Sequence, residues 1–415
     1  MNNKIKMTAG ILAAAVVISA VAVVSSMAKT KPRVPRLING TTEAWEEEMP
    51  ETTDAPETGV DAEYVSFAQK LAGQMNDEEN WFLSPHSIYT ALLMAANGAD
   101  GETKTQLLDA LGVKDLEAAN EYAAIFREKV KTNDKITLET ADSLWLNTDA
   151  MNGIEFSDSY KKLCAEIFDA AVEEVTAADA VAKVNAWVSE KTHGRIKDLI
   201  SDNGFDAALV DTIYLKADWE KEFDKSSTYK QVFHSKNGDE KDIDFMHQTE
   251  NFEYAESGDA QIAVMPYKGG AVSMLLILGE YEGDVEKLIS EAEYSDSLLY
   301  LALPKISSAS SFTLNDIMKK LGAVDCFDPS KADFKPMVTA GNMYIEEIIH
   351  KANVDVDEKG TEAAAATAIV VRATSMMEPG PEKPIEFICD RPFTYLIRDN
   401  ETGEILFIGR YNNAE

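Results

Sequence analysis

The stretch that most constrains how this chain can fold runs from His350 to Pro379. Residues 350–356 alternate apolar or imidazole side chains with Lys, Asn and Asp, a period-two pattern typical of a strand with one buried and one wet face. The run Thr361 to Thr374 then contains no proline or glycine and only two charges, Glu362 and Arg372. A strand is therefore followed by an unusually uncharged and unbroken segment.

This second segment suits a strand and a loop equally well. Every second residue from Thr361 is small or apolar, so none would be costly on the inner face of a sheet. The earlier register must slip by one residue to keep Glu362 out of the sheet, and Gly360 is typical of such a bulge. The alanines at 363–366, however, have poor strand propensity, and two prolines follow soon after. The pattern favours a segment that moves between the two states.

The composition is globular and excludes some classes of partner. The chain has 415 residues, of which 45% are hydrophobic and 27% charged, enough for a large core. Its net charge of −33 argues against a nucleic-acid or other polyanion surface, which needs clustered Lys and Arg. No His stands at metal-binding spacing, so we expect no metal and no cofactor. We expect inert buried thiols at the three cysteines, Cys164, Cys326 and Cys389.

The amino terminus predicts export. In residues 1–28, two lysines precede an uncharged apolar run from Thr8 to Val24 and then small residues, the pattern of a signal peptide. The run is long enough that an uncleaved membrane anchor is the alternative. Residues 29–60 are rich in Pro, Thr and Glu and predict a linker. We therefore expect a folded domain at 61–415, secreted to the extracellular space or anchored at the cell envelope, with membrane contact only if the first segment is retained.

Helical patterns crowd the first half of the chain and strand patterns the second. Apolar spacing predicts a helix through Tyr64 to Leu71, and Ser84 with Pro85 predicts the start of another that ends at Gly98. Further helices are expected at 102–111, 115–130, 157–168, 178–192, 284–292 and 312–321, the last capped by Ser311 or Thr313. Strands are expected at 136–146, 209–215, 261–266, 272–278, 298–303, 344–356, 393–397 and 405–408. This order indicates an α+β fold with large, mainly antiparallel sheets.

Eight segments resemble the serpin family, in the order in which that family has them. NWFLSPHSIYTALLMAANGADGETKTQLLDALG resembles its second and third helices, VNAWVSEKTHGRIKDLI its surface helix, and LVDTIYLKADWEKEFD a strand of its central sheet. The others are VMPYKGGAVSMLLILGE, LALPKISS, LGAVDCFDPSKADF, HKANVDVDEKGTEAAAATA and DRPFTYLIRDNETGEILFIGRYNNA. The resemblance spans about Asp61 to Ala414. It implies the serpin fold: a helix-rich N-terminal half, a large central β-sheet, two further sheets and an exposed reactive loop.

The resemblance also implies roles for individual residues. The reactive bond would join Thr374 to Ser375, with Arg372 and Ala373 setting loop specificity. The hinge would comprise Glu358, Gly360, Thr361, Glu362, Ala363, Ala364, Ala365, Ala366 and Thr367. The region where the sheet opens would contain Ser84, Ser87, Asp211, Trp219, Lys305 and His350, with Lys305 paired to Glu358.

Two positions depart from the family pattern: Ala217 replaces a usual Gly, and the departure that matters more is at Asp211. Asp211 stands where relatives usually carry Asn beside the buried His350. A carboxylate there can form a charge-assisted hydrogen bond with the imidazole, but it must lose its hydration to do so. We therefore expect the opening of the sheet to depend on pH.

The activity implied by the resemblance is irreversible inhibition. A serine endopeptidase, elastase-like or subtilisin-like, would attack the loop and be trapped as a covalent acyl-enzyme when the cleaved loop enters the central sheet of a metastable, monomeric inhibitor. The chain has no assembled nucleophile, so we do not expect an enzyme. Two alternatives remain: a non-inhibitory carrier with the serpin fold, and an envelope-tethered interaction module. The small hinge residues favour the inhibitor.

Overall fold

The computed structural model describes residues 59–76, 78–131, 136–201, 205–281, 284–361 and 383–414. The expected signal or anchor segment, most of the linker and residues 362–382 of the expected loop lie outside the described residues. Within the described part of the chain, no helix combines the length and the apolar character needed to span a bilayer.

Helix α3 (Pro85–Gly98) lies at the centre of the domain. Ser84 caps it from an extended conformation, its Oγ accepting a hydrogen bond from the Ser87 N–H at 3.1 Å, and Pro85 occupies the first turn. Almost every side chain of α3 is buried. The predicted start and end of this helix are confirmed. The other helices are α2 (Gly59–Ala72), α4 (Gly101–Leu111), α5 (Leu116–Lys131), α6 (Asp158–Phe168), α7 (Ala180–Lys191), α8 (Val285–Glu291) and α9 (Asn315–Lys320).

The first of two sheets has six strands within the described residues. Their order is β10–β11–β12–β4–β2–β3. The β11–β4 and β2–β3 pairs are parallel, and the other neighbouring pairs in this order are antiparallel. The strands are β10 (Ile306–Thr313), β11 (Glu347–Val356), β12 (Gly360–Thr361), β4 (Ala207–Asp218), β2 (Ile136–Asn147) and β3 (Ala171–Val175).

The second sheet has nine strands in the described part of the chain. Its order is β1–β15–β14–β8–β7–β6–β9–β13, with β5 also paired to β6. The long strand β6 pairs with β5 and β9 along most of its length and with β7 at its end, so the two smaller sheets expected from the resemblance are continuous through it. The strands are β1 (Trp81–Leu83), β5 (Thr228–His234), β6 (Glu240–Ser257), β7 (Ala260–Pro266), β8 (Val272–Leu278), β9 (Ser295–Pro304), β13 (Ile385–Ile388), β14 (Phe393–Asp399) and β15 (Ile405–Tyr411).

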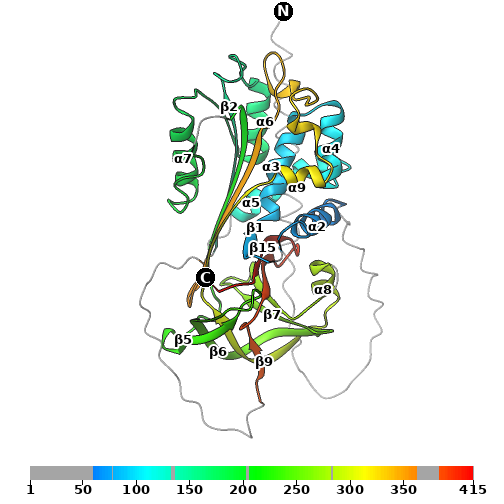
Figure 1. Ribbon diagram of the computed structural model, residues 1–415. Helices are drawn as coiled ribbons and strands as arrows, with labels where there is room; N and C mark the ends of the chain where they lie inside the picture. The colour runs from blue at the N-terminus through cyan, green and yellow to red at the C-terminus, as the bar shows by residue number, and fades with distance from the viewer. Residues whose placement is uncertain are drawn as a thin grey trace, which may run out of the picture. The chain divides into compact units, whose positions relative to one another are not determined.

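The six-stranded sheet is covered on both faces (Figure 1). On one face, Val184 and Val188 of α7 pack against Trp145 of β2 and Val210 of β4. On the other face, α3 and α6 share a core with inward-facing residues of the same strands, such as Leu209. Alternate residues of β2 and β4 therefore enter two different cores, which holds these strands in register.

One helix prediction was wrong at its start. Residues 306–313 form β10, so α9 begins only at Asn315, and its N-cap is Leu314, which makes no side-chain capping bond. The predicted caps Ser311 and Thr313 are strand residues. The strand was missed because its Ser-rich sequence has low β-propensity, and pairing with β11 overrides that preference. Strands β1, β3, β5, β6 and β13 were also missed; β3, β5, β6 and β13 interleave apolar residues with charged or polar ones.

All three cysteines are free and buried, as the sequence predicted. Burial raises the thiol pKa of Cys164 and Cys326 to about 12. At neutral pH these thiols are protonated and therefore poor nucleophiles. The described residues contain no group of His, Cys, Asp or Glu side chains arranged to hold a metal ion.

Candidate functional site

The boundary between β4 and β11, called the seam below, is paired only along part of its length. The parallel ladder runs from Glu347 opposite Ala208 to Ala352 opposite Ile213 and ends there. Further along, β12 lies between the two strands, with Thr361 paired both to Ala217 of β4 and to β11. The sheet is thus already forked, and the first residues of the expected hinge occupy the mouth of the fork.

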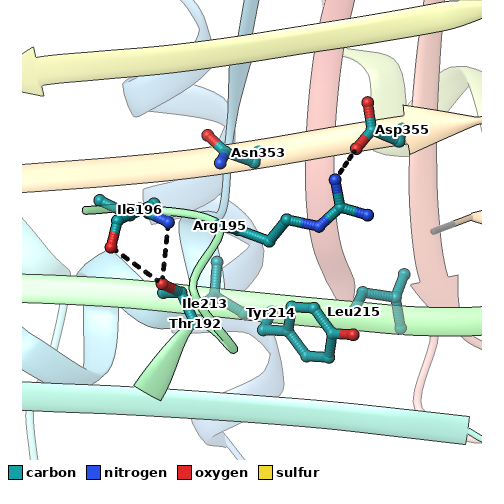
Figure 2. Close-up of a pocket in the computed structure, with 8 residues that line it drawn as sticks. All are labelled: Thr192, Arg195, Ile196, Ile213, Tyr214, Leu215, Asn353 and Asp355. Carbon is teal, nitrogen blue, oxygen red and sulfur yellow. Dashed lines mark hydrogen bonds and ion pairs between the residues drawn. The ribbon is translucent and has the colours of Figure 1, made fainter. Parts of the chain in front are cut away.

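A small cavity lies between the end of the ladder and β12. Its volume is about 20 Å³, room for about one water molecule. Arg195, from the segment after α7, reaches across it to β11, where its Nη1 lies 2.9 Å from Oδ2 of Asp355 (Figure 2). The buried Oδ1 of Asn353 makes no hydrogen bond within the described part of the chain, which is a cost to the closed sheet. The lining residues are Thr192, Arg195, Ile196, Ile213, Tyr214, Leu215, Asn353 and Asp355.

The chain reverses direction between β11 and β12. The Asp357 N–H donates to the carbonyl oxygen of Gly360 at 2.9 Å, and Oδ1 of Asp357 accepts the N–H of Lys359 at 2.8 Å. The expected one-residue change of face does occur, since Val356 and Thr361 are both buried, but an Asp-capped turn produces it in place of a bulge. The turn buries Glu358 and Thr361, which are 4% and 3% exposed.

Glu358 is held by an ion pair and a hydroxyl. Its Oε1 lies 2.8 Å from Nζ of Lys305 and accepts a hydrogen bond from Oγ1 of Thr228, also at 2.8 Å. Burial alone would raise the Glu358 pKa, but the bonds from Lys305 and Thr228 outweigh it, and the pKa lies below its ordinary value. Glu358 is ionised at neutral pH, and the pair fixes the turn to β5 and to the end of β9.

Trp219 and Tyr267 hold the same turn from the side of β4. Their rings stack with centroids 4.4 Å apart, and Nε1 of Trp219 donates to the carbonyl oxygen of Asp357 at 3.0 Å. The Tyr267 hydroxyl is hydrogen-bonded to Oγ1 of Thr361 at 2.6 Å. The sequence analysis did not single out Tyr267. The signal was the Pro-Tyr-Lys-Gly-Gly run, which places an aromatic residue at a strand end.

Lower in the seam, three side chains and one backbone N–H form a buried network beneath the paired part of β4 and β11. The Ser84 N–H donates to Nε2 of His350 at 3.2 Å, and Nδ1 of His350 lies 2.6 Å from Oδ2 of Asp211. Oγ of Ser87 is hydrogen-bonded to the other oxygen of Asp211. Because Nε2 accepts a bond, the imidazole carries its proton on Nδ1 and donates it to Asp211. The network is a neutral His beside an ionised carboxylate.

A second buried carboxyl group was missed by the sequence analysis. Asp142 of β2 lies directly opposite Asp211 in the β2–β4 ladder and is 2% exposed. The available signal was an acidic residue inside an otherwise apolar strand, Thr-Ala-Asp-Ser-Leu-Trp-Leu.

The structure thus brings together two groups of predicted residues, one at each end of the seam. Glu358, Gly360, Thr361, Trp219 and Lys305 meet at the turn. Ser84, Ser87, Asp211 and His350 meet beneath the ladder. The hinge residues from Glu362 to Thr367, and the loop residues Arg372, Ala373, Thr374 and Ser375, lie outside the described residues, and their roles stay predictions.

The substitution Gly360→Ala should expel β12 from the seam. A Cβ at this position would overlap the carbonyl oxygen of Ala217 and come within 2.8 Å of the Asp218 Cα, and neither backbone atom can move cheaply. We expect a loss of about 1–3 kcal/mol of native stability, typical of overpacking, together with faster amide hydrogen exchange at Thr361. Gly73→Ala, where the added Cβ meets only ordinary contacts, is the control. Unchanged exchange in Gly360→Ala would contradict this account of the turn.

Comparison with known proteins agrees with this geometry. A family model described as Serpin (serine protease inhibitor) matches residues 62–414. Human serpin B8 is 32% identical over 368 residues, covering 83% of this chain and 96% of that protein. An uncharacterized serpin-like protein of Methanosarcina acetivorans is 33% identical and is covered to 82%, as is this chain. The native structure of the thermophilic serpin tengpin matches with a TM-score of 0.77 at 28% identity, over 89% of this chain and 96% of that one. This chain belongs to the serpin family, whose members generally inhibit serine proteases.

Proposed function

We propose that this protein is an irreversible inhibitor of serine endopeptidases that traps its target by inserting a cleaved loop into the seam between β4 and β11. The observation that carries the proposal is the fork in the sheet, with Gly360 and Thr361 already paired to β4. Attack after Thr374 would form an acyl-enzyme and free the preceding residues to extend β12 as a new strand.

The pairing pattern supports opening at this seam. β2 pairs with β4 along Ile136 to Leu146, and β10 pairs with β11 along Ile306 to Thr313. The ladder between β4 and β11 is shorter, covering only 208–213 on the β4 side. The sheet should therefore part between β4 and β11, leaving β3–β2–β4 and β11–β10 as two blocks, because fewer residues pair across this boundary than between β2 and β4 or between β10 and β11.

Extending the observed pairing predicts where the new strand would lie. Thr361 is antiparallel to both neighbours, opposite Ala217 on one side and Val356 on the other. If both registers continued for six more residues, residue 367 would lie between Asp211 and His350. Insertion would therefore separate this buried pair while adding ladder hydrogen bonds worth about 1 kcal/mol each. The Arg195 bridge over the cavity must also open (Figure 2).

The fold alone does not decide between an inhibitor and a carrier. Human thyroxine-binding globulin in complex with thyroxine has a similar fold, with a TM-score of 0.73 at 22% identity. The inhibitor is favoured by the small residues at the start of the hinge, since only glycine fits the close approach of Gly360 to β4. An envelope-tethered interaction module is the other alternative, and like the carrier it would form no covalent complex with a protease.

The finer parts of the proposal rest on sequence. Thr374 offers a small β-branched side chain, which suits the shallow apolar pocket of an elastase-like enzyme, and a subtilisin-like enzyme is the second candidate. The apolar amino-terminal run supports an extracellular protein, secreted or held at the envelope. We expect the free inhibitor to be monomeric, with no cofactor.

A mixture with elastase or subtilisin should give an inhibitor–protease band that survives denaturing electrophoresis. Thr361→Arg should reduce this band and increase cleaved inhibitor severalfold, because a cation would enter the buried site beside Tyr267. Thr105→Arg adds the same charge on the exposed side of α4 and serves as the control. An unchanged ratio of complex to cleaved inhibitor in Thr361→Arg would rule out insertion through this fork.

Cleavage of the loop should raise the melting temperature. The added strand stabilises the cleaved form by more than the few degrees that a typical point mutation changes. Intact protein and protein nicked by a non-target protease would be melted at the same pH. Equal midpoints would favour the carrier.

The trapped complex should release a carboxy-terminal peptide beginning at Ser375. Attack after Arg372 by a trypsin-like enzyme would shorten the inserted strand by two residues, about 7 Å of reach, and should mainly yield cleaved inhibitor. Mass spectrometry of the released peptide identifies the bond. A peptide from the complex that starts at Ala373 or Met377 would overturn the assignment.

A further inference from the structure

Three titratable side chains lie in one row across the seam. Asp142 of β2 is in register with Asp211 of β4, which is in register with His350 of β11. Directly opposite residues in an antiparallel pair have Cβ atoms about 4.5–5.5 Å apart, so the two carboxyl groups are close neighbours. Exposure is 2% for Asp142 and 0% for both Asp211 and His350. Two buried acids therefore lie side by side, and the neutral imidazole is hydrogen-bonded to one of them, Asp211.

The hydrogen bonds show which acid carries the charge. Asp211 accepts a bond at each oxygen, from Nδ1 of His350 and from Oγ of Ser87, and both bonds stabilise its ionised form. The buried Oδ1 of Asp142 has no hydrogen-bond partner among the described residues. Ionising Asp142 would place a second, poorly compensated charge beside the first. Burial, followed by the charge of Asp211, raises the pKa of Asp142 well above its usual range.

None of the described groups that face the two carboxyl groups supplies a positive charge that would stabilise a second ionised carboxylate. Burial raises the Asp211 pKa, and His350 and, from α3, His86 oppose this rise only in part. Nδ1 of His86 is itself engaged 2.6 Å from Oε1 of Glu404. From α6, Cys164 acts on the same region, and its thiol is neutral at pH 7. No lysine or arginine of the described residues contributes to the pKa of either carboxyl group.

We propose that Asp142 and Asp211 form a carboxyl pair that holds a single proton, and that Asp142 is a positioning residue for loop insertion. In the closed sheet, His350 donates a hydrogen bond to the Asp211 carboxylate. Insertion removes His350 with β11, whereas Asp142 stays beside Asp211 because β2 and β4 separate from β11 together. The Asp142 O–H then donates to the Asp211 carboxylate, which is not left buried without its principal donor. The insertion step rests on the proposed function; the shared proton does not.

The pair also gives the closed sheet a defined pH dependence. Asp142 has a raised pKa in the folded state, so its contribution to native stability is fully present below the unfolded value of about 3.9 and is lost as pH rises through the folded value. Between the unfolded and the folded pKa values, the unfolded chain gains from ionising Asp142 and the native sheet does not. The pair therefore makes the native state less stable as pH rises.

The shared proton is tested without any protease. Infrared spectroscopy of protein with ¹³C-carboxyl-labelled aspartate, at pH 7, should show a protonated carboxyl band that disappears in Asp142→Asn and, in the wild type, disappears again at high pH. Labelling only aspartate excludes Glu286, whose pKa burial raises to about 8. No such band in the wild type, or the same band in Asp142→Asn, would overturn the carboxyl pair.

Thermal melting measures its consequence. Asp142→Asn keeps the shape and an N–H donor but cannot ionise, so its midpoint should exceed that of the wild type by a few degrees at pH 8 and converge with it near pH 4. Asp109→Asn, on the exposed side of α4, is the control and should shift little at any pH. A constant difference between Asp142→Asn and wild type across this range would contradict the linkage.

The positioning role of Asp142 is tested by measuring the ratio of covalent complex to cleaved inhibitor. Asp142→Leu removes the donor and should lower the ratio of covalent complex to cleaved inhibitor severalfold, whereas Asp142→Asn should restore most of it. Equal ratios in the two variants would refute the donor role. If no variant, including wild type, forms a complex, the proposed function fails, while the infrared and melting results still decide whether the proton is shared.

Discussion

The structure depends on how β4 and β11 are joined, because every predicted site residue that the structure describes lies on or beside this seam. A sheet interior is stable when each backbone group is paired, yet here the parallel ladder stops at Ile213 and Ala352 and resumes only through β12. The cavity between the end of this ladder and β12 is small, with a volume of about 20 Å³. The closed sheet therefore keeps an incomplete ladder in a tightly packed site, and another strand is the arrangement that would complete it.

Two kinds of restraint keep the seam closed, and they differ in strength. The turn at Glu358 and Thr361 is held by the buried Glu358 carboxylate, which pairs with a Lys305 side chain that is 40% exposed, and by the buried Tyr267 hydroxyl; losing either bond leaves a buried polar atom without a partner. The Arg195–Asp355 bridge, by contrast, is half exposed on both sides, and an ion pair in water contributes at most about 1 kcal/mol. The segment after α7 is thus a weak cover over the cavity, and the buried turn is the stronger restraint.

Sequence predicted the elements with strong local signals and missed those that tertiary pairing creates. Ser84 and Pro85 carry their own capping chemistry, so the start of α3 could be predicted; β10 is Ser-rich and becomes a strand only beside β11. The turn at Asp357 was mistaken for a bulge because both begin with an interrupted alternation, and only the hydrogen bond from Asp357 to Gly360 distinguishes them. Asp142 was missed because a sequence shows an acidic residue in a strand without showing that its cross-strand neighbour is also acidic.

The two ends of the seam respond to pH with opposite signs. Glu358 has a lowered pKa, so its ion pair contributes stability above the unfolded pKa of the carboxyl group and loses it as pH falls through the folded value. Asp142 has a raised pKa, and its contribution is instead lost as pH rises. Mildly acidic conditions therefore stabilise both ends of the seam, because Glu358 is ionised there and Asp142 is protonated. Stronger acid weakens the turn at the mouth of the fork, whereas alkali weakens the buried pair beneath the ladder, so the seam would begin to fail at a different end in each case.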